Sequence, residues 1–382
     1  LTQKYDEVCT NPPYMGGSGM NATLSDFIKK NYPDYKSDLF SAFVIKCTKM
    51  AKLEGYLGFL TPYVWMFIQS YEKMRNYIYN TRTIETLIQF EYSAFEEATV
   101  PICTFVLKNS KVRKNGAYLR LTEFRGGMEV QRQKALEAIS NHKCGFYYES
   151  NAENFSKIPG SPVAYWVSEN FVRAFDGKKV GNYLNCRSGI MTGSDEFIKQ
   201  WYEVNYNNIK FNCKTAKDML DYKWFPLNSG GEFRKWYGNN SKIVNLQNDG
   251  AKIKATVKNF RLREKTFYFK RGITWGRITS SKIAFRDVIQ GSLFGDAGPI
   301  GFIEENRNYL LGFLCSNVSL FCLQATNPTL NYQVRDIESE PLILSVGHLP
   351  LVNKKVQENI DLSKADWDSF ETSWDFEGHP LV

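Results

Sequence analysis

Two spacings of apolar residues divide the first 110 residues into segments of different secondary structure. Short apolar runs bounded by turn residues predict strands over residues 5–9, 55–61, 84–90 and 101–107. Apolar residues that recur every three or four positions predict helices over residues 39–51 and 70–80. Thr23, with Asp26 three positions later, predicts the N-cap of a shorter helix that ends near Tyr32. Strands that alternate with helices indicate an α/β sheet with parallel strands.

The pattern changes after residue 109. Another strand is expected over residues 117–123, a polar helix over 128–140, and one amphipathic helix over 310–324. Between the last two, aromatic and basic residues mix with glycines, asparagines and short β-like runs. We therefore expect four parts: an α/β sheet over residues 1–125, a connector over 126–164, a mixed α+β domain over 165–345, and a tail over 346–382 that is first helical and then acidic.

The composition limits the classes of protein to which the chain could belong. Hydrophobic residues make up 43% and aromatic residues 15% of the 382 positions, which is enough to bury sizeable cores. The most apolar segment, residues 55–67, is short and interrupted by Pro62, so we expect no membrane span. The eight cysteines form no C-x-x-C pair, and the three histidines have no Cys or His at metal-ligand spacing. We therefore expect free thiols in a reducing cytoplasm and no metal site.

The net charge of +8 is concentrated in one block of the sequence. Residues 181–300 hold 20 Lys and Arg against 10 Asp and Glu, so this block has a net charge of +10 and the rest of the chain −2. Localised positive charge suits binding to a phosphate backbone, although a solvated basic face would give the same count.

Asn11-Pro12-Pro13-Tyr14, at the end of the first predicted strand, is the segment that most clearly suggests chemistry. The Asn11 side-chain oxygen and the Pro12 carbonyl are two hydrogen-bond acceptors, and consecutive prolines fix the backbone without adding N–H donors. Two acceptors beside the Tyr14 ring fit the amino group of a flipped-out adenine, whose nitrogen must leave conjugation with its ring before it attacks a methyl group. The alternative is a diproline turn with a surface tyrosine.

Further motifs follow the tetrapeptide in a fixed order. They are Asp38–Phe43, Gly55–Pro62, Ala94-Phe95 and Val100–Leu107. Together with Asn11–Tyr14, this order resembles the γ-class adenine-N6 DNA methyltransferases. The resemblance implies a Rossmann-like sheet and S-adenosylmethionine as methyl donor, with Asp38, Leu39 and Phe40 bordering that cofactor. It also implies that Tyr14 and Phe95 stack on opposite faces of the flipped adenine; the alternative for Phe95 is a core aromatic.

A second set of motifs extends the resemblance over almost the whole chain. They are residues 15–21, 165–168, 185–193, 272–275, 327–334 and 366–376. This set is similar to the PglX-type adenine methyltransferases of BREX phage-defence systems, and type IIG restriction-modification methyltransferases share much of it. The resemblance implies that double-stranded DNA is the substrate and that other defence proteins are partners. It also implies that residues 165–345 are a target-recognition domain, with residues 310–344 similar to type I specificity subunits.

One feature of this family is missing from the sequence. A glycine-rich strand-to-helix turn and an acidic ribose-binding residue would precede Asn11, but only ten residues do, and the glycines at 16–19 follow the motif. We therefore expect a fold that starts with the C-terminal half of the methyltransferase sheet. We also expect the chain to be an internal fragment that binds S-adenosylmethionine weakly and is inactive alone.

Basic and aromatic residues interleave in the expected recognition domain, most densely over residues 260–271. Cations there would neutralise phosphates, whereas the pattern does not identify the side chains that read base edges. The candidate phosphate contacts are Lys223, Arg234, Lys235, Arg261, Arg263, Lys270, Arg271 and Arg277. For each of them the alternative is a solvated surface charge.

The sequence thus predicts a site-specific DNA methyltransferase that flips an adenine and acts in phage defence or restriction-modification. Two alternatives stay open. The chain could serve only as a non-catalytic DNA-binding specificity module, or it could methylate protein glutamine or RNA, since those enzymes share the Asn-Pro-Pro-Tyr tetrapeptide.

Overall fold

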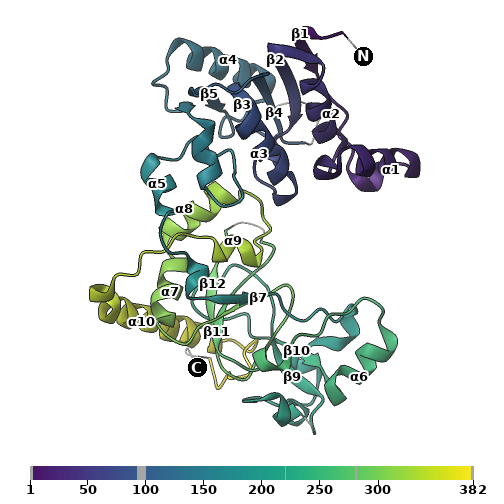
Figure 1. Ribbon diagram of the computed structural model, residues 1–382. Helices are drawn as coiled ribbons and strands as arrows, with labels where there is room; N and C mark the ends of the chain where they lie inside the picture. The colour runs from purple at the N-terminus through teal and green to yellow at the C-terminus, as the bar shows by residue number, and fades with distance from the viewer. Residues whose placement is uncertain (1–2, 93–99, 220, 280–281, 380–382) are drawn as a thin grey trace. The chain divides into compact units, whose positions relative to one another are not determined.

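The computed structural model describes residues 3–92, 100–219, 221–279 and 282–379. The chain forms two compact units (Figure 1). The first unit is Leu1–Asp176 with Ala325–Asn327, and the second unit is Gly177–Gln324 with Pro328–Val382. Each unit has a large hydrophobic core of its own.

The first unit is built on one mixed six-stranded sheet with the order β1-β2-β4-β3-β5-β6. The strands are β1 (Tyr5–Thr10), β2 (Ala51–Pro62), β3 (Thr83–Gln89), β4 (Ile102–Lys108), β5 (Gly116–Arg120) and β6 (Tyr147–Ser150). Strands β1 and β2 are parallel, as are β3 and β5, but β4 runs antiparallel to both of its neighbours. The expectation of parallel strands is therefore wrong for β4. β4 is the next strand after β3 in the chain and pairs with it antiparallel, which makes the sheet a mixed one.

The helices of the first unit are α1 (Ala22–Asn31), α2 (Leu39–Thr48), α3 (Glu72–Thr81), α4 (Gly127–Ser140) and α5 (Glu169–Ala174). Helices α2, α3 and α4 bury apolar residues against the sheet, whereas α1 packs on α2 and α5 packs on the segment that precedes it. Val44 of α2 and Ile78 of α3 lie in one cluster with Leu57 and Phe105 of the sheet, and none of the four is more than 1% exposed. The N-cap of α1 is Asn21, whose side chain accepts the Leu24 N–H, rather than the predicted Thr23.

Residues 126–164, which we expected to be a connector, are part of the first unit. They supply α4 and also β6, which pairs antiparallel with β5 and satisfies the backbone groups along that edge of the sheet. Phe155 is 1% exposed and packs edge-on against Tyr79 and Tyr118. Tyr165 stacks on Tyr118 at 4.8 Å between ring centroids, so the first unit continues past the position where the sequence texture changes.

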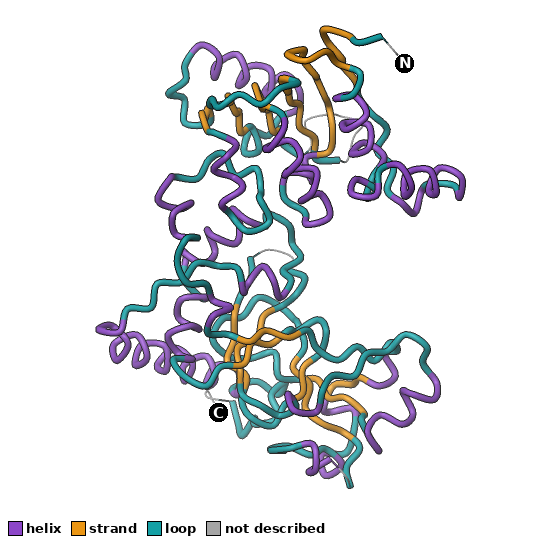
Figure 2. The backbone as a smooth tube through the Cα atoms, viewed as in Figure 1, coloured by secondary structure: helices purple, strands orange, loops and turns teal. Residues whose placement is uncertain are grey.

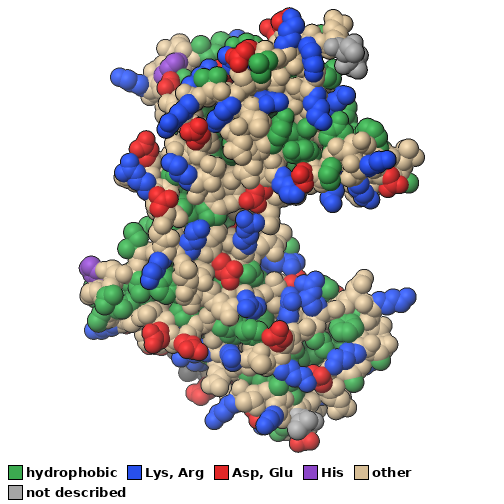
Figure 3. All heavy atoms as spheres, in the orientation of Figure 1, with side chains coloured by type: hydrophobic (Ala, Val, Ile, Leu, Met, Phe, Trp, Pro, Cys, Tyr) green, Lys and Arg blue, Asp and Glu red, His purple; other side chains and the backbone are tan. Residues whose placement is uncertain are grey.

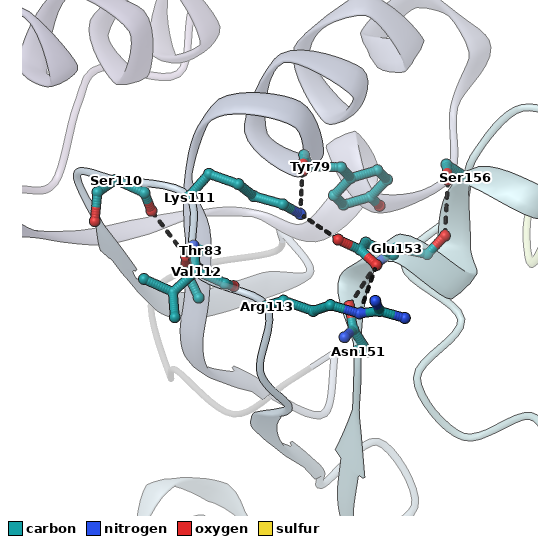
Figure 4. Close-up of polar contacts among 9 residues, drawn as sticks. All are labelled: Tyr79, Thr83, Ser110, Lys111, Val112, Arg113, Asn151, Glu153 and Ser156. Carbon is teal, nitrogen blue, oxygen red and sulfur yellow. Dashed lines mark hydrogen bonds and ion pairs between the residues drawn. The ribbon is translucent and has the colours of Figure 1, made fainter.

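Polar contacts fasten this added segment to α3 and β4 (Figure 4). The Lys111 ammonium donates to the Tyr79 carbonyl at 2.7 Å and lies 3.4 Å from the Glu153 carboxylate, which Arg113 also approaches at 3.5 Å. The Thr83 hydroxyl donates to the Ser110 carbonyl at 2.8 Å. Groups from four separate stretches of sequence therefore meet beside the end of α3.

The second unit consists of short strands separated by long loops (Figure 2). Its strands form two four-stranded sheets with the orders β13-β9-β10-β8 and β12-β11-β14-β7. The strands are β7 (Asn185–Arg187), β8 (Ile198–Gln200), β9 (Trp224–Asn228), β10 (Lys242–Asn245), β11 (Gly272–Trp275), β12 (Phe285–Val288), β13 (Leu293–Phe294) and β14 (Ile300–Phe302). The helices that begin after Asp176 are α6 (Gln247–Thr256), α7 (Arg307–Leu314), α8 (Asn317–Thr326), α9 (Val334–Glu338) and α10 (Leu349–Asp368).

Two predictions for the end of the chain need correction. The single helix expected over residues 310–324 is two helices, α7 and α8, bent by 63°. The break arises because the Ser316 hydroxyl accepts the Ser319 N–H and starts a new helix. The expected tail is part of the second unit, since Val356 and Ile360 of α10 are buried in the same cluster as Leu311 of α7.

Within the described residues, no single helix is long and apolar enough to cross a bilayer; α7 and α8 meet that test only as a bent pair.

Candidate functional site

The Asn-Pro-Pro-Tyr segment leaves the carboxyl end of β1, next to the parallel strand β2. Asn11 and Tyr14 are exposed, and Tyr14 retains 36% of its surface. The Tyr14 hydroxyl lies 2.8 Å from Asn11 Oδ1 and 3.2 Å from the Leu60 carbonyl oxygen of β2, and it donates to these acceptors. The tetrapeptide is therefore a closed corner on the carboxyl edge of the sheet, where ligands bind in open α/β folds.

The loop that follows this corner is tied to the start of α2. Asp38 Oδ1 accepts the Met15 N–H at 2.9 Å and caps α2 by accepting the Phe40 N–H at 3.2 Å. The Leu39 N–H donates to the Met15 carbonyl at 3.0 Å. Asp38 therefore fixes the direction in which the chain leaves Tyr14, and both of its hydrogen bonds fall on one carboxylate oxygen.

An aromatic layer supports the Tyr14 ring from within the unit. Phe40 has no exposed surface and meets Tyr14 edge-on, with 6.4 Å between centroids and 87° between planes. Phe40 in turn stacks on Tyr71 at 5.3 Å. Burial, and then the Cys103 thiol, raise the pKa of Tyr14 above its ordinary value of 10.0, so its hydroxyl stays a neutral donor at physiological pH.

The structure brings together some of the residues that the sequence predicted and not others. Asn11 and Tyr14 are in hydrogen-bond contact, with Asp38 one loop away. Leu39 and Phe40 are 8% and 0% exposed, so both are core residues beneath the site rather than open surface. Phe95 lies outside the described residues.

Leu60 and Tyr71 are parts of this site that no sequence motif predicted. Leu60 contributes only its carbonyl oxygen, which no side-chain pattern reveals. Tyr71 lies in the turn before α3 and stacks on Phe40, and burial, followed by the charge of Asp38, raises the pKa of Tyr71. Deeper still, burial raises the pKa of Cys103 to about 12, so this thiol is a buried hydrophobic group and not a nucleophile.

No group of three or more His, Cys, Asp or Glu within the described ranges is arranged to hold a metal ion. The chemistry on offer at the corner is therefore hydrogen-bond acceptance by Asn11 and the adjoining carbonyls, beside an aromatic face supplied by Tyr14.

Five of the eight candidate phosphate contacts in the second unit already have partners there. Arg234 pairs with Asp366 at 2.9 Å, Arg271 with Asp287 at 3.0 Å, and Arg277 with Asp296. The Lys235 ammonium donates to the Cys315 carbonyl at 2.7 Å, and Arg263 Nε donates to the Gly189 carbonyl at 2.8 Å. These partners are far away in sequence, so local charge counts could not reveal them.

The other three candidates, Lys223, Arg261 and Lys270, are exposed. The Lys270 ammonium lies 6.0 Å from the centroid of the Phe267 ring, and that of Lys223 lies 5.8 Å from the Trp224 ring. On the face in Figure 3, Lys and Arg side chains are interspersed with Asp and Glu. The net positive charge of the central block is therefore only partly available to a polyanion.

Comparison with known proteins agrees with the motifs. Residues 1–95 match the family model described as "Eco57I restriction-modification methylase". The chain is 34% identical to the adenine-specific methyltransferase PglX of Lacticaseibacillus casei (strain Zhang), a match that covers 100% of this chain and 33% of that protein. It is 33% identical to the adenine-specific methyltransferase BrxX of Escherichia coli O9:H4 (strain HS), covering 100% of this chain and 31% of that protein.

Among solved structures, the fold is similar to the type IIL restriction-modification enzyme MmeI in complex with DNA. The TM-score is 0.61 at 11% sequence identity, with 97% of this chain and 50% of that chain covered. The chain spans about a third of the length of the curated relatives it matches. The resemblance predicted from the motifs is confirmed: the chain is similar over its whole length to part of the adenine-specific methyltransferases PglX and BrxX, and over residues 1–95 to the Eco57I methylases.

Proposed function

We propose that this chain carries the catalytic corner and the DNA-contacting unit of an adenine-specific DNA methyltransferase of restriction-modification or phage defence. The observation that carries the proposal is the exposed corner in which Tyr14 donates to Asn11 at the carboxyl edge of the sheet. Its support is the similarity to PglX and BrxX over the whole chain.

Asn11 and Pro12 would make the adenine amino group reactive. The nitrogen lone pair of adenine is delocalised into the ring, and it becomes available when both amino hydrogens are held by acceptors out of the ring plane. Asn11 Oδ1 has two lone pairs, so it can accept one of these hydrogens while it also accepts the Tyr14 hydroxyl. The Pro12 carbonyl, held by the diproline backbone, would accept the other.

Tyr14 would stack on one face of the flipped adenine and stabilise the positive charge that develops on its nitrogen. The edge of Phe40 and the hydrogen bond to Asn11 hold the Tyr14 ring in place. The Tyr14 side chain therefore loses little conformational entropy when a base binds. Stacking by Phe95 on the opposite face is part of the same proposal. The nitrogen becomes acidic once it is methylated, so the site needs no general base.

S-adenosylmethionine, when bound, supplies a methyl group on a positively charged sulfur. In this chain Asp38 fits a role beside that cofactor, because its hydrogen bonds to Met15 and Phe40 both use Oδ1 and leave Oδ2 as an acceptor. Leu39 and Phe40 are buried, so they would form the apolar wall behind the bound cofactor.

Product analysis tests the proposal. The protein as its host makes it is incubated with S-adenosylmethionine labelled in the methyl group and with DNA, RNA or a glutamine-containing peptide. We expect label in N6-methyladenine of double-stranded DNA. Label in RNA or in the glutamine peptide, or sequence-specific DNA binding without any methyl transfer, would contradict the proposal and support one of the alternatives left open by the sequence.

A further inference from the structure

The second unit contains a cleft of about 500 Å³ whose lining combines two arginines with two phenylalanine rings and the carboxylate of Glu264. It lies between β7, the segment before Phe267, and β13. Its lining residues are Cys186, Arg187, Ser188, Leu262, Arg263, Glu264, Phe267, Phe294 and Val334. Arg187 and Ser188 belong to the sequence motif at residues 185–193. The proposed chemistry at Asn11 does not use this motif.

The backbone behind this cleft is tightly fixed. A Cβ on Gly189 would lie 2.1 Å from the Gly295 carbonyl oxygen, so only glycine fits there. The next residue, Ile190, donates its N–H to the Phe294 carbonyl at 2.7 Å, and Met191 exchanges backbone hydrogen bonds of 2.9 and 2.7 Å with Arg261. Arg187 and Ser188 therefore extend from a rigid segment, which favours precise contacts over adaptable ones.

Both cleft arginines are oriented by neighbours that use only part of their donors. The Arg187 guanidinium lies 5.2 Å from the Phe267 ring centroid, and its Nη1 donates to the Cys186 carbonyl at 2.8 Å. Arg263 is held through Nε by the Gly189 carbonyl at 2.8 Å, which leaves its two terminal nitrogens as donors. Neither forms an ion pair with a residue in the described part of the chain, in contrast to Arg234, Arg271 and Arg277.

We propose that this cleft holds DNA and that Arg187 and Arg263 read base edges there, so that they set which sequence is methylated. This inference rests on the proposed function, because that function supplies DNA as the substrate. A planar guanidinium with two free donors matches the O6 and N7 acceptors of guanine in the major groove. A guanidinium fork also matches a phosphate, and the salt dependence of DNA binding separates the two kinds of contact. The Ser188 hydroxyl adds a donor and acceptor beside Arg187.

The experiment compares methylated sites rather than total activity. Genomic DNA is mapped for N6-methyladenine in cells that express the protein as its host makes it, with Arg187→Lys, Arg263→Lys or Arg261→Lys. The first two variants keep the charge but lose the two-donor edge, and we expect each to relax the recognised sequence at one position by about tenfold or more. Arg261→Lys is the matched control: its backbone pair with Met191 survives, and the recognised sequence should not change.

A second measurement tests whether each arginine contacts a base or a phosphate, independently of the methylation map. Binding of the protein, as its host makes it, to duplex DNA is followed against salt concentration. A base contact replaced by methionine leaves the log-log slope nearly unchanged, whereas a lost phosphate contact lowers it by about 0.9. An unchanged recognised sequence in both lysine variants, or a slope that falls by about 0.9 in Arg187→Met and Arg263→Met, overturns the assignment.

This failure differs from failure of the proposed function. If no protein variant, wild type included, methylates adenine in DNA, the proposed function falls. If methylation occurs and its sequence preference ignores Arg187 and Arg263, only the cleft assignment falls.

Discussion

The residues proposed to carry chemistry are neighbours in sequence in the first unit, whereas in the second unit they come from distant segments. Asn11 and Tyr14 are three residues apart and hydrogen-bonded to each other. The cleft of the second unit instead joins Arg187 to Arg263 through the Gly189 carbonyl and the Phe267 ring. One region presents a short rigid corner, and the other presents a surface assembled by tertiary structure.

This difference separates what each unit can tolerate. The corner in the first unit is made by consecutive residues that share one backbone conformation. Single side-chain substitutions there should therefore lower the rate of methyl transfer without unfolding the protein. In the second unit several cations are bound to acids or carbonyls of the same unit, and where the partner is buried, as Asp287 is, its substitution should affect folding before it affects DNA.

Apart from loss of Asn11, the largest effect expected in this comparison comes from the Tyr14 ring. Tyr14→Ala should lower kcat/KM for DNA methylation by about 100-fold, because stacking of one base on an aromatic ring contributes ~1–3 kcal/mol. Tyr14→Phe keeps the ring and loses one hydrogen bond to Asn11, so its loss should stay below about tenfold. Steady-state kinetics on a cognate duplex measure both. Equal losses in the two variants would show that the hydroxyl, and not the ring, carries the effect.

The next largest effect concerns the stability of the second unit. The Asp287 side chain is 1% exposed and pairs with both Arg271 and Arg307, so Asp287→Asn should cost about 3 kcal/mol of unfolding free energy. Asp366→Asn is the control. Its carboxylate is 61% exposed and pairs with Arg234, and the expected cost is below about 1 kcal/mol. Denaturant titration compares the two, and similar costs would contradict a structural role for the buried ion pair.

A smaller effect separates free cations from those already bound within the unit. Lys223 is exposed, whereas Lys235 donates to the Cys315 carbonyl. Lys223→Met should lower the log-log salt slope of DNA binding by about 0.9, and Lys235→Met should leave it unchanged. Titration of duplex DNA at several salt concentrations gives both slopes. A drop for Lys235→Met equal to that for Lys223→Met would mean that the intramolecular contact does not withhold the charge from DNA.

The smallest effect is a pH dependence in the second unit. Glu340 is 2% exposed, and burial raises the pKa of its carboxyl well above the usual range. A raised pKa in the folded state contributes stability that is complete below the ordinary value of 4.5 and is lost as the pH rises toward the folded value. Glu340→Gln should therefore gain stability relative to the wild type between pH 5 and pH 8. Thermal melts of both proteins across this pH range test the prediction. A difference in melting temperature that stays constant with pH would refute the raised pKa of Glu340.

The sequence was sufficient where structure depends on local pattern. The strands around Tyr5, Ile84 and Ile102 lie where the apolar runs predicted them, and α2 lies within the helix predicted over residues 39–51. The sequence alone was insufficient where the structure depends on contacts between residues far apart in the chain. The edge strand β6 and the contact of Arg234 with Asp366 depend on partners that no local window contains. The break before α8 has a local cause, the Ser316 cap, but the apolar spacing continues across it and hides it.

The most direct test of the account is to measure DNA binding and methyl transfer together in Asn11→Ala. Asn359→Ala serves as the matched control, at a half-buried asparagine on α10 whose side chain donates to the Lys355 carbonyl of the same helix. Loss of one transition-state hydrogen-bond partner costs about 100-fold or more in rate, so Asn11→Ala should lose that much transfer and keep its affinity for DNA within about twofold. Undiminished transfer in Asn11→Ala, or equal losses of transfer and binding, would contradict the central claim.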